Sequence, residues 1–360
     1  MNMTPIPRIA AGLALVLLGG CSDATGPAED RIVEGVNLDA LFADPSPSEV
    51  ASVEADWAGR DPSAASVVTE LDETVTAGGT SLRLRVVSHE VDGNRHYGAI
   101  VVPTDLQGTA PVIIYSHGGD GGVDVDEALL IFSVAGDLAD ESVWVIPSFR
   151  SESLQFDGQS WTSEGDPSPW DRDVDDGLAL LDVALAVEPG ADPNDIAILG
   201  VSRGAGVGLL MGIRNARIDR IVEFFGPTDF FDVFVQDVVE EALLGAPRNL
   251  PGLAYLNETL IQPLRRGEVT TAQARLELIR RSAVVYASQL PRLQLHHGTA
   301  DAVVEVSQAE SMIRTMEALG RSAPDFEGFL YEGGGHNPLT MPGSLDRALE
   351  FLFPGGAPSG

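Results

Sequence analysis

The sequence contains no lysine and only one cysteine, Cys21. All 22 cationic residues are arginine, and 54 aspartate and glutamate residues outnumber them to give a formal net charge of −32. Such an acidic chain argues against a nucleic-acid partner, because the phosphate backbone requires a cationic surface. A single cysteine excludes a disulfide within the chain. Since the sequence contains no cluster of cysteine and histidine, we expect neither a metal nor an organic cofactor.

Residues 196–206 are the most informative stretch of the chain. An apolar run typical of a buried strand leads into the motif G-V-S-R-G at 200–204, and small residues that can start a helix follow. In a G-x-S-x-G motif between a strand and a helix, the serine takes a strained conformation and its hydroxyl projects from the turn. Gly200 and Gly204 remove Cβ atoms that would collide in such a turn. Ser202 is therefore the candidate nucleophile.

A serine hydroxyl is a weak nucleophile, so a base and an acid that orients the base are expected further along the chain. Residues 293–301 are typical of a strand that ends in a glycine turn, which places Asp301 at the carboxyl end of the strand. Residues 326–332 alternate like another strand, and the glycine-rich loop after them carries His336. The order serine, aspartate, histidine is typical of enzymes with this strand–turn–helix motif.

Two alternatives stay open for the acid and the base. His336 could be an ordinary histidine of a surface loop, and Glu305 is the nearest alternative acid. None of the five other histidines follows the strand that carries the acid: His89, His96, His117, His296 and His297. His336 is therefore the expected base.

Two backbone N–H groups are expected to stabilise the oxyanion of a tetrahedral intermediate. One belongs to Arg203, directly after the nucleophile. The second is expected in the loop 116–122, which follows a buried strand and contains the turn H-G-G. Gly118 or Gly119 is the candidate donor, because backbone without side chains can approach the developing charge closely. His117 is expected to fix this loop rather than to act as a second base.

From residue 111 the sequence alternates between strand and helix patterns, which is typical of a parallel sheet with helices on both faces. Three earlier strands are separated by short turns and are expected to form an antiparallel edge of the same sheet. The predicted fold class is α/β, with a mostly parallel central sheet in one large domain over 61–360. The predicted strands are 67–76, 81–91, 95–102, 112–115, 143–147, 196–201, 221–225, 292–297 and 326–331.

An insertion at about 227–290 falls between the nucleophile strand and the acid strand, where it is expected to cap the pocket. Its periodicity predicts helices over 230–244 and 270–286. Five aromatic side chains in or beside it could line a pocket for an acyl group or a side chain: Phe224, Phe225, Phe230, Phe231 and Phe234. For at least half of them, packing in the core is the expected role.

The first 21 residues have the pattern of a lipoprotein signal peptide. Arg8 precedes an apolar run at 9–18, which is too short to span a membrane, and the run L-G-G-C ending at Cys21 resembles the bacterial lipobox. The mature protein is then expected to be anchored by lipid at an extracytoplasmic membrane face of the bacterial envelope. The outer membrane is favoured, because Ser22 is not the aspartate that commonly retains such proteins at the inner membrane. The alternative is an ordinary signal peptide and plain secretion.

Residues 22–60 are rich in alanine, aspartate, proline and serine. They are expected to form a tether over 22–46 and a short helix over 47–57. Such a tether would hold the catalytic domain clear of a membrane surface.

Residues 67–352 resemble the α/β-hydrolase fold, and within it the catalytic domain of the prolyl oligopeptidase family and its dienelactone-hydrolase-like neighbours. Four stretches add to the G-x-S-x-G motif. They match a P-x-[YF]-R-G turn, an acidic helix start, an R-S-P-x-x-Y segment and an H-G-x-x-D motif: 147–151, 171–176, 281–286 and 297–301. The sequence departs from the family at Ser151, Ala205 and Ala283, where glycine, glycine and proline are usual.

The resemblance implies a serine hydrolase that cleaves a small ester or a short peptide through an acyl-enzyme, without a cofactor. The chain has no room for the β-propeller of the large oligopeptidases, and no pair of glutamates for a peptide amino terminus can be identified. A carboxylesterase, for instance one that acts on acetylated sugars, is the alternative enzyme. A lipoprotein that keeps the fold only for binding is the non-enzymatic alternative. Arg150 and the acidic residues of 171–176 are expected to form a buried ion pair that braces the sheet, and the alternative is that they are substrate ligands.

Overall fold

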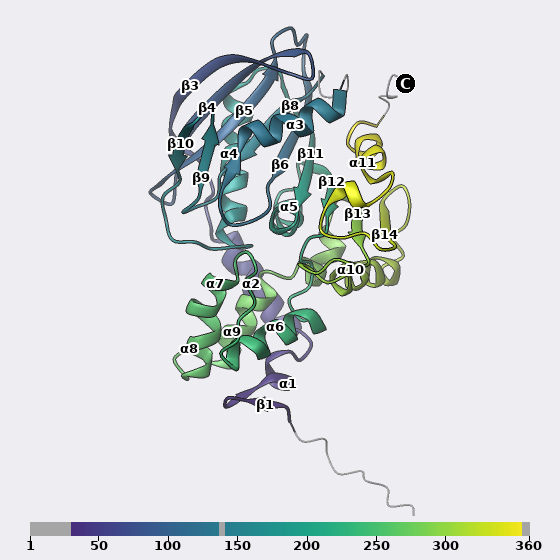
Figure 1. The fold of residues 1–360 in the computed structure, drawn as a ribbon. Coiled ribbons are helices and arrows are strands. Elements are labelled where there is room, and N and C mark those ends of the chain that lie inside the picture. The colour runs from purple at the N-terminus through teal and green to yellow at the C-terminus, as the bar shows by residue number, and fades with distance from the viewer. Residues whose placement is uncertain (1–29, 137–140, 355–360) are drawn as a thin grey trace, which may run out of the picture.

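A nine-stranded sheet lies at the centre of the computed structural model, which describes residues 30–136 and 141–354 (Figure 1). The spatial order of the strands is β14, β13, β12, β11, β6, β8, β5, β4, β3. Each of the strands predicted from the sequence is present. Their bounds are β3 (Ala65–Ala77), β4 (Thr80–Val91), β5 (Asn94–Pro103), β6 (Ala110–Ser116), β8 (Val143–Pro147), β11 (Ala191–Val201), β12 (Ile218–Phe224), β13 (Arg292–Gly298) and β14 (Phe326–Tyr331).

The strands that run parallel to one another are β14, β13, β12, β11, β6 and β8. Strands β5, β4 and β3 form an antiparallel edge beside β8. The predicted α/β fold with antiparallel N-terminal strands is thus confirmed. Strand β11 lies near the middle between β6 and β12, and its residues 196–198 are fully buried because both faces are covered. In a sheet of this kind, the carboxyl ends of the parallel strands are where ligands bind.

Helices cover both faces of the sheet and bury two separate apolar layers. Helices α3 (Val125–Ala135) and α11 (Ser344–Leu352) pack on one face. The other face is covered by three helices: α4 (Arg172–Val187), α5 (Arg203–Arg214) and α10 (Ser307–Ala318). Among the described residues, no helix has the length and apolar content that crossing a membrane requires.

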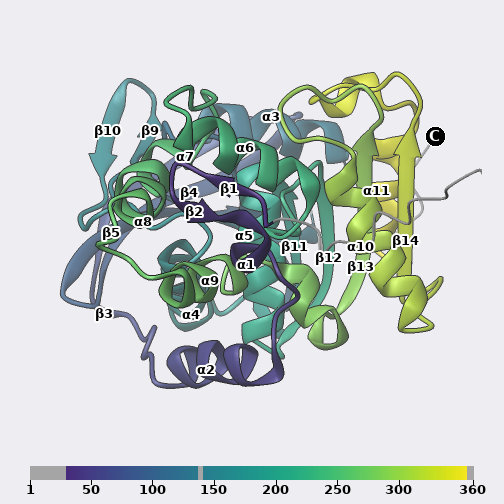
Figure 2. The ribbon, with the colours of Figure 1, turned by 90° about the horizontal axis from the view of Figure 1, so that it is seen from below.

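The insertion at 227–290 forms the expected helical cap, which Figures 1 and 2 show grouped beside one end of the sheet. The second predicted helix is wrong in its length: α9 ends at Ile279, and Ser282 is extended with its hydroxyl accepting a hydrogen bond from the N–H of Phe230 at 2.8 Å. The cap elements are α6 (Val233–Leu243), α7 (Leu253–Leu256), the π-helix η2 (Asn257–Ile261), α8 (Gln262–Arg265), α9 (Thr271–Ile279) and the 3₁₀-helix η3 (Ala283–Gln289), with η4 (Pro338–Thr340) following His336.

The tether predicted over 22–46 is wrong for residues 30–46, which fold against the cap, while 22–29 lie outside the described residues. The Arg275 guanidinium on α9 explains this, because it donates to four backbone carbonyls of residues 40–44 and to the carboxylate of Glu49. The predicted helix at 47–57 is present. The elements are β1 (Ile32–Val33), β2 (Val36–Asn37), α1 (Leu38–Leu41) and α2 (Pro47–Ala58).

A small second sheet lies beside the loop that follows β6, and the sequence analysis missed it. Its strand order is β10, β9, β7, and its central strand pairs over only a few residues with each neighbour. Strands this short carry little alternation, so the pattern of the sequence does not reveal them. The bounds are β7 (Val123–Asp124), β9 (Ser153–Phe156) and β10 (Gln159–Thr162).

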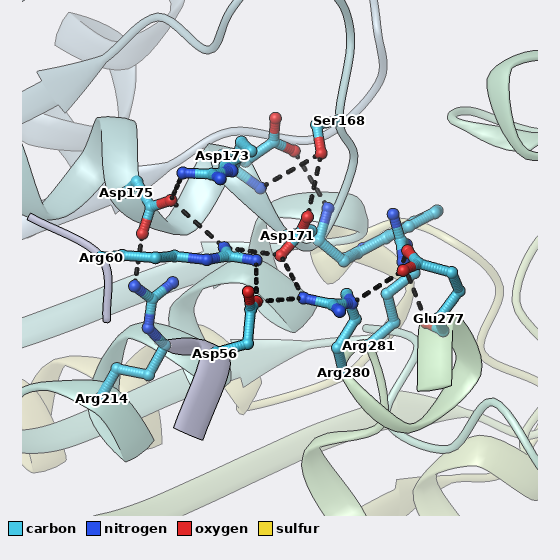
Figure 3. Close-up of polar contacts among 12 residues, drawn as sticks. Asp56, Arg60, Ser168, Asp171, Asp173, Asp175, Arg214, Glu277, Arg280 and Arg281 are labelled. Atoms are coloured by element: carbon cyan, nitrogen blue, oxygen red, sulfur yellow. Dashed lines mark hydrogen bonds and ion pairs between the residues drawn. The ribbon is translucent and has the colours of Figure 1, made fainter. Parts of the chain in front are cut away.

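A network of ion pairs joins the cap to the helices of the core (Figure 3). Arg60, just after α2, lies 2.7 Å from the carboxylates of Asp56 and Asp171 and 3.2 Å from that of Asp175. Arg280 of the cap lies 2.7 Å from the same Asp56 carboxylate. Burial alone would raise the pKa of Asp171, but the surrounding arginines outweigh it and lower this pKa to about 2. Helices α2, α4 and α9 are therefore held together by charge as well as by apolar contact.

The expected ion pair between Arg150 and the acidic helix start is present, and Asp176 is the partner. The guanidinium donates to the Asp176 carboxylate at 2.5 and 3.0 Å, and the backbone N–H of Arg150 adds a third hydrogen bond at 3.0 Å. Asp176 is fully buried. The other acidic residues of 171–176 pair with different arginines, so the cluster is several ion pairs rather than one.

Arg150→Ala should lower the free energy of unfolding by about 3–5 kcal/mol, because it leaves the Asp176 carboxylate buried without a counter-charge. The matched control is Arg83→Ala, which removes an exposed pair with Asp72 and should cost about 1 kcal/mol or less. Urea denaturation of both variants measures the difference. An Arg150→Ala protein with unchanged stability would show that the pair does not brace the fold.

Candidate functional site

Ser202 lies in the turn between β11 and α5, at the carboxyl end of the sheet. Its backbone has φ 54° and ψ −123°, a conformation that costs a residue with a side chain about 1–3 kcal/mol. A Cβ on Gly200 would lie 2.6 Å from Cα of Ala205, and one on Gly204 would lie 2.1 Å from the carbonyl oxygen of Ser116. Only glycine fits at these two positions. The turn therefore has the geometry that the G-x-S-x-G motif predicts.

The structure brings together the three side chains that the sequence predicts for the site. Nε2 of His336 lies 2.9 Å from Oγ of Ser202, and Nδ1 of His336 lies 2.7 Å from Oδ2 of Asp301. The ring of Phe225 lies against the imidazole, with 4.2 Å between the centroids. A hydrogen-bonded chain thus runs from the serine hydroxyl through the imidazole to a carboxylate.

The carboxylate of Asp301 is held in place by the backbone of its own loop. Its Oδ1 accepts hydrogen bonds from the N–H groups of Val303 at 2.8 Å and Val304 at 3.1 Å. Burial would raise the pKa of Asp301, but the His336 ring and these two N–H groups outweigh it and hold the pKa below its usual value. Asp301 therefore stays ionised and can stabilise a cationic imidazole.

The loop 116–122 lies against the turn that carries Ser202. A Cβ on Gly118 would lie 3.0 Å from Cβ of Ser202, so glycine allows this close approach, and Gly119 takes a positive φ of 78°. His117 is buried, and its ring stacks on Phe149 with 4.6 Å between the centroids. Burial lowers the pKa of His117 to about 4, so the ring is neutral at pH 7. These contacts match the expected role of His117 in fixing the loop.

The side chain of Arg203 makes contacts that the sequence analysis did not predict, because it assigned only the backbone N–H of this residue. The buried guanidinium donates to the carboxylate of Asp173 at 2.6 and 3.1 Å and to the carbonyl oxygen of Gly119 at 3.0 Å. It also forms a short ion pair with Glu152. Burial raises the pKa of Glu152 to about 7, against the opposing effect of Arg203. One signal was available: an arginine inside a buried turn requires acidic partners.

The alternative candidates from the sequence lie elsewhere. Glu305 is half-buried and accepts a hydrogen bond from Arg248 at 3.3 Å, whereas Asp301 contacts His336 directly. His296 stacks between Phe224 and Phe329, and His297 donates to the carbonyl oxygen of Val304. Within the parts of the chain that the structure describes, no three side chains of histidine, cysteine, aspartate or glutamate are placed to hold a metal.

An apolar pocket of about 90 Å³ adjoins Ser202 beneath the cap. Apart from Ser202 and Arg203, its lining residues are apolar: Trp170, Pro227, Phe230, Phe234, Val235, Val238, Val239, Leu250, Pro251, Leu253, Leu256, Leu260, Ile261, Leu278, Val303 and Val304. Of the five aromatic candidates, Phe230 and Phe234 line the pocket. The other three pack in the core or against other rings, as expected for at least half of them.

No family model matches this sequence, and no curated protein is significantly similar to it. Solved structures match the fold. An acetyl xylan esterase from Thermoanaerobacterium sp. JW/SL YS485 aligns with a TM-score of 0.59 and 16% identity, over 88% of this chain and 98% of that one. One from Paenibacillus sp. R4 aligns with a TM-score of 0.55 and 17% identity, over 87% and 98%.

The fold is the α/β-hydrolase fold. A puromycin-hydrolysing peptidase from Mycobacterium tuberculosis also matches it, with a TM-score of 0.52 and 17% identity over 79% of this chain. This chain spans only 41% of that peptidase. Alignments at such low identity establish the shared fold alone.

Glu223 is a fully buried carboxyl group on β12, beside the strand that carries the serine turn. It pairs in register with Gly200, and one of its oxygens accepts the N–H of Gly226 at 2.9 Å. Its other oxygen has no hydrogen-bond partner among the described residues. Burial raises the pKa of Glu223 from 4.5 to about 8, against the weaker effect of that N–H group. The folded protein therefore keeps this group protonated at pH 7.

Glu223→Gln should reduce the pH dependence of stability. Because the folded pKa lies above the unfolded value, the contribution of Glu223 is fully present below pH 4.5 and is lost as the pH rises toward 8. The melting temperature of the wild type should fall over this window, and that of Glu223→Gln should fall less. Glu73→Gln, on the exposed strand β3, is the control and should follow the wild type. Parallel curves for wild type and Glu223→Gln would contradict the assignment.

Proposed function

We propose that the protein is a serine hydrolase that cleaves a carboxylic ester through an acyl-enzyme. The observation that carries the proposal is the hydrogen-bonded chain from Ser202 through His336 to Asp301, which ends beside an apolar pocket. Without these three groups together, the fold alone would not indicate a reaction, because one fold supports many functions.

In the first half of the reaction, His336 Nε2 takes the proton of Ser202 as Oγ forms a bond to the acyl carbon. The carbonyl electron pair moves onto oxygen, and the backbone N–H of Arg203 with that of Gly118 or Gly119 stabilises the oxyanion. When the pair returns, the bond to the leaving oxygen breaks and the imidazolium gives that oxygen its proton. Asp301 orients the imidazole and stabilises its cationic form.

In the second half, water replaces the alcohol. The water molecule gives a proton to His336 Nε2 as the water oxygen attacks the acyl carbon. The ester bond between the acyl carbon and Oγ of Ser202 then breaks. The imidazolium returns the proton to the serine, and the carboxylic acid leaves. Atoms and charge balance without a cofactor.

Two observations support an ester over a peptide. Among the described residues that line the apolar pocket there is no carboxylate to pair with the cationic amino terminus of a peptide, because the one charged side chain in this lining is the guanidinium of Arg203. The two acetyl xylan esterases are matched over 98% of their length, whereas the peptidase is matched over 41%. A short peptide or amide remains the second candidate substrate, because the same three side chains can cleave it.

Replacing members of the proposed triad should lower kcat on p-nitrophenyl butanoate in a set order. Ser202→Ala and His336→Ala should each cost roughly 10⁶-fold, and Asp301→Asn about 10⁴-fold, because the carboxylate acts only through the imidazole. Ser202→Ala should also lose labelling by a fluorophosphonate probe. The control Ser48→Ala changes an exposed serine on α2 and should leave both measurements unchanged. Labelling that survives Ser202→Ala would place the nucleophile elsewhere.

We further propose that Cys21 carries a lipid anchor, so that the enzyme acts at an extracytoplasmic membrane face of the bacterial envelope. The support is the L-G-G-C run and the fact that the chain has no other cysteine. One acyl chain binds a bilayer only marginally, and bacterial lipoprotein processing adds a diacylglyceryl group, which supplies two chains.

Cys21→Ser should move the protein from the detergent-rich phase to the aqueous phase of a Triton X-114 extraction, or leave its signal peptide uncleaved. Ser22→Asp is the matched variant: it should keep the anchor and move the protein from the outer to the inner membrane on a sucrose gradient. Wild-type protein in the aqueous phase would contradict the anchor and favour plain secretion.

A further inference from the structure

Two pockets in the cap share one wall. The apolar pocket beside Ser202 and a second pocket of about 410 Å³ are both lined by Leu256 and Leu260, the two lining residues that they have in common. Leu256 ends α7 and Leu260 lies one turn further, in the π-helix η2. Both side chains are buried. The two leucines therefore form part of the wall of the apolar pocket, and the second pocket lies on their other side.

The second pocket differs in its chemistry. Polar and charged side chains contribute to its lining: Thr259, Gln273, Glu277, Arg280 and Arg281. Leu276 of α9 lines this pocket and is absent from the lining of the first. The boundary at Leu256 and Leu260 thus separates an apolar space at the nucleophile from a more polar space in the outer cap.

The apolar pocket has few hydrogen-bond partners for an acyl group that carries polar substituents. Among the described residues that line the pocket, Arg203 is the one with a cationic group, and this guanidinium already donates to Asp173, Glu152 and Gly119. A hydroxyl or charged group on the acyl chain would lose its hydration there without gaining a partner. A methyl or methylene group would instead leave water for an apolar surface.

We propose that the apolar pocket binds the acyl part of the substrate and that this acyl part is an unbranched apolar chain longer than acetyl. Leu256 and Leu260 set the upper limit of the chain length. This inference rests on the proposed serine hydrolase function. Each methylene that enters the pocket raises kcat/KM about fourfold, from the free energy of burying a methylene group. Once the chain reaches the two leucines, further methylenes stay outside and the gain ends.

The test measures kcat/KM of the full-length protein on p-nitrophenyl acetate, butanoate, hexanoate and dodecanoate. Wild-type enzyme should prefer butanoate to acetate by about fifteenfold, since two methylenes are added, and dodecanoate should fall below butanoate. Leu260→Ala and Leu256→Ala join the two pockets and should each raise the ratio of dodecanoate to butanoate at least tenfold. The matched control Leu276→Ala makes the same change in the second pocket alone and should keep the wild-type ratio.

Leu260→Val is a second variant in case the alanine substitution prevents folding, and it should move the ratio in the same direction by a smaller factor. Labelling of Ser202 by a fluorophosphonate separates two kinds of failure. The inference about the pocket is overturned if labelled enzyme prefers acetate, or if the ratio of dodecanoate to butanoate is the same in Leu260→Ala as in the wild type. Either result leaves the hydrolase function in place. Enzyme that is neither labelled nor active on any of the esters overturns the proposed function itself.

Discussion

The guanidinium of Arg203 is the interaction on which the geometry around Ser202 depends. It lies directly after the serine and ties three separate segments to the turn: the start of α4 through Asp173, the loop before β9 through Glu152, and the loop after β6 through the Gly119 carbonyl. Because the cation is buried, each of these contacts also offsets the cost of removing its charge from water. The strained turn and the glycine loop are thus fixed relative to each other before any substrate arrives.

The features that could be predicted from the sequence are those whose signal is local. The buried strands are short apolar runs, the serine turn is five consecutive residues, and Asp301 and His336 each follow a strand directly. The carboxyl ends of parallel strands meet at one end of a sheet, so three residues spread over 134 positions could be assigned to one site.

The features that could not be predicted depend on contacts between distant segments. Glu152 is 51 positions from Arg203, and nothing in either stretch indicates the other. The folding of residues 30–46 depends on Arg275, more than 230 positions away, so a segment with the composition of a tether becomes part of the structured protein. The wall at Leu256 and Leu260 likewise depends on how several short helices pack, which periodicity does not determine.

The attachment of residues 30–46 to the cap also changes how an anchored enzyme would stand on a bilayer. Only eight residues then separate Cys21 from Asp30, where the described structure begins, and a chain of that length reaches at most about 30 Å. Because this segment packs on α9 and not on the far side of the sheet, the cap would be the part of the enzyme nearest the lipid. The acyl pocket proposed beneath that cap would then belong to the part of the enzyme nearest the bilayer.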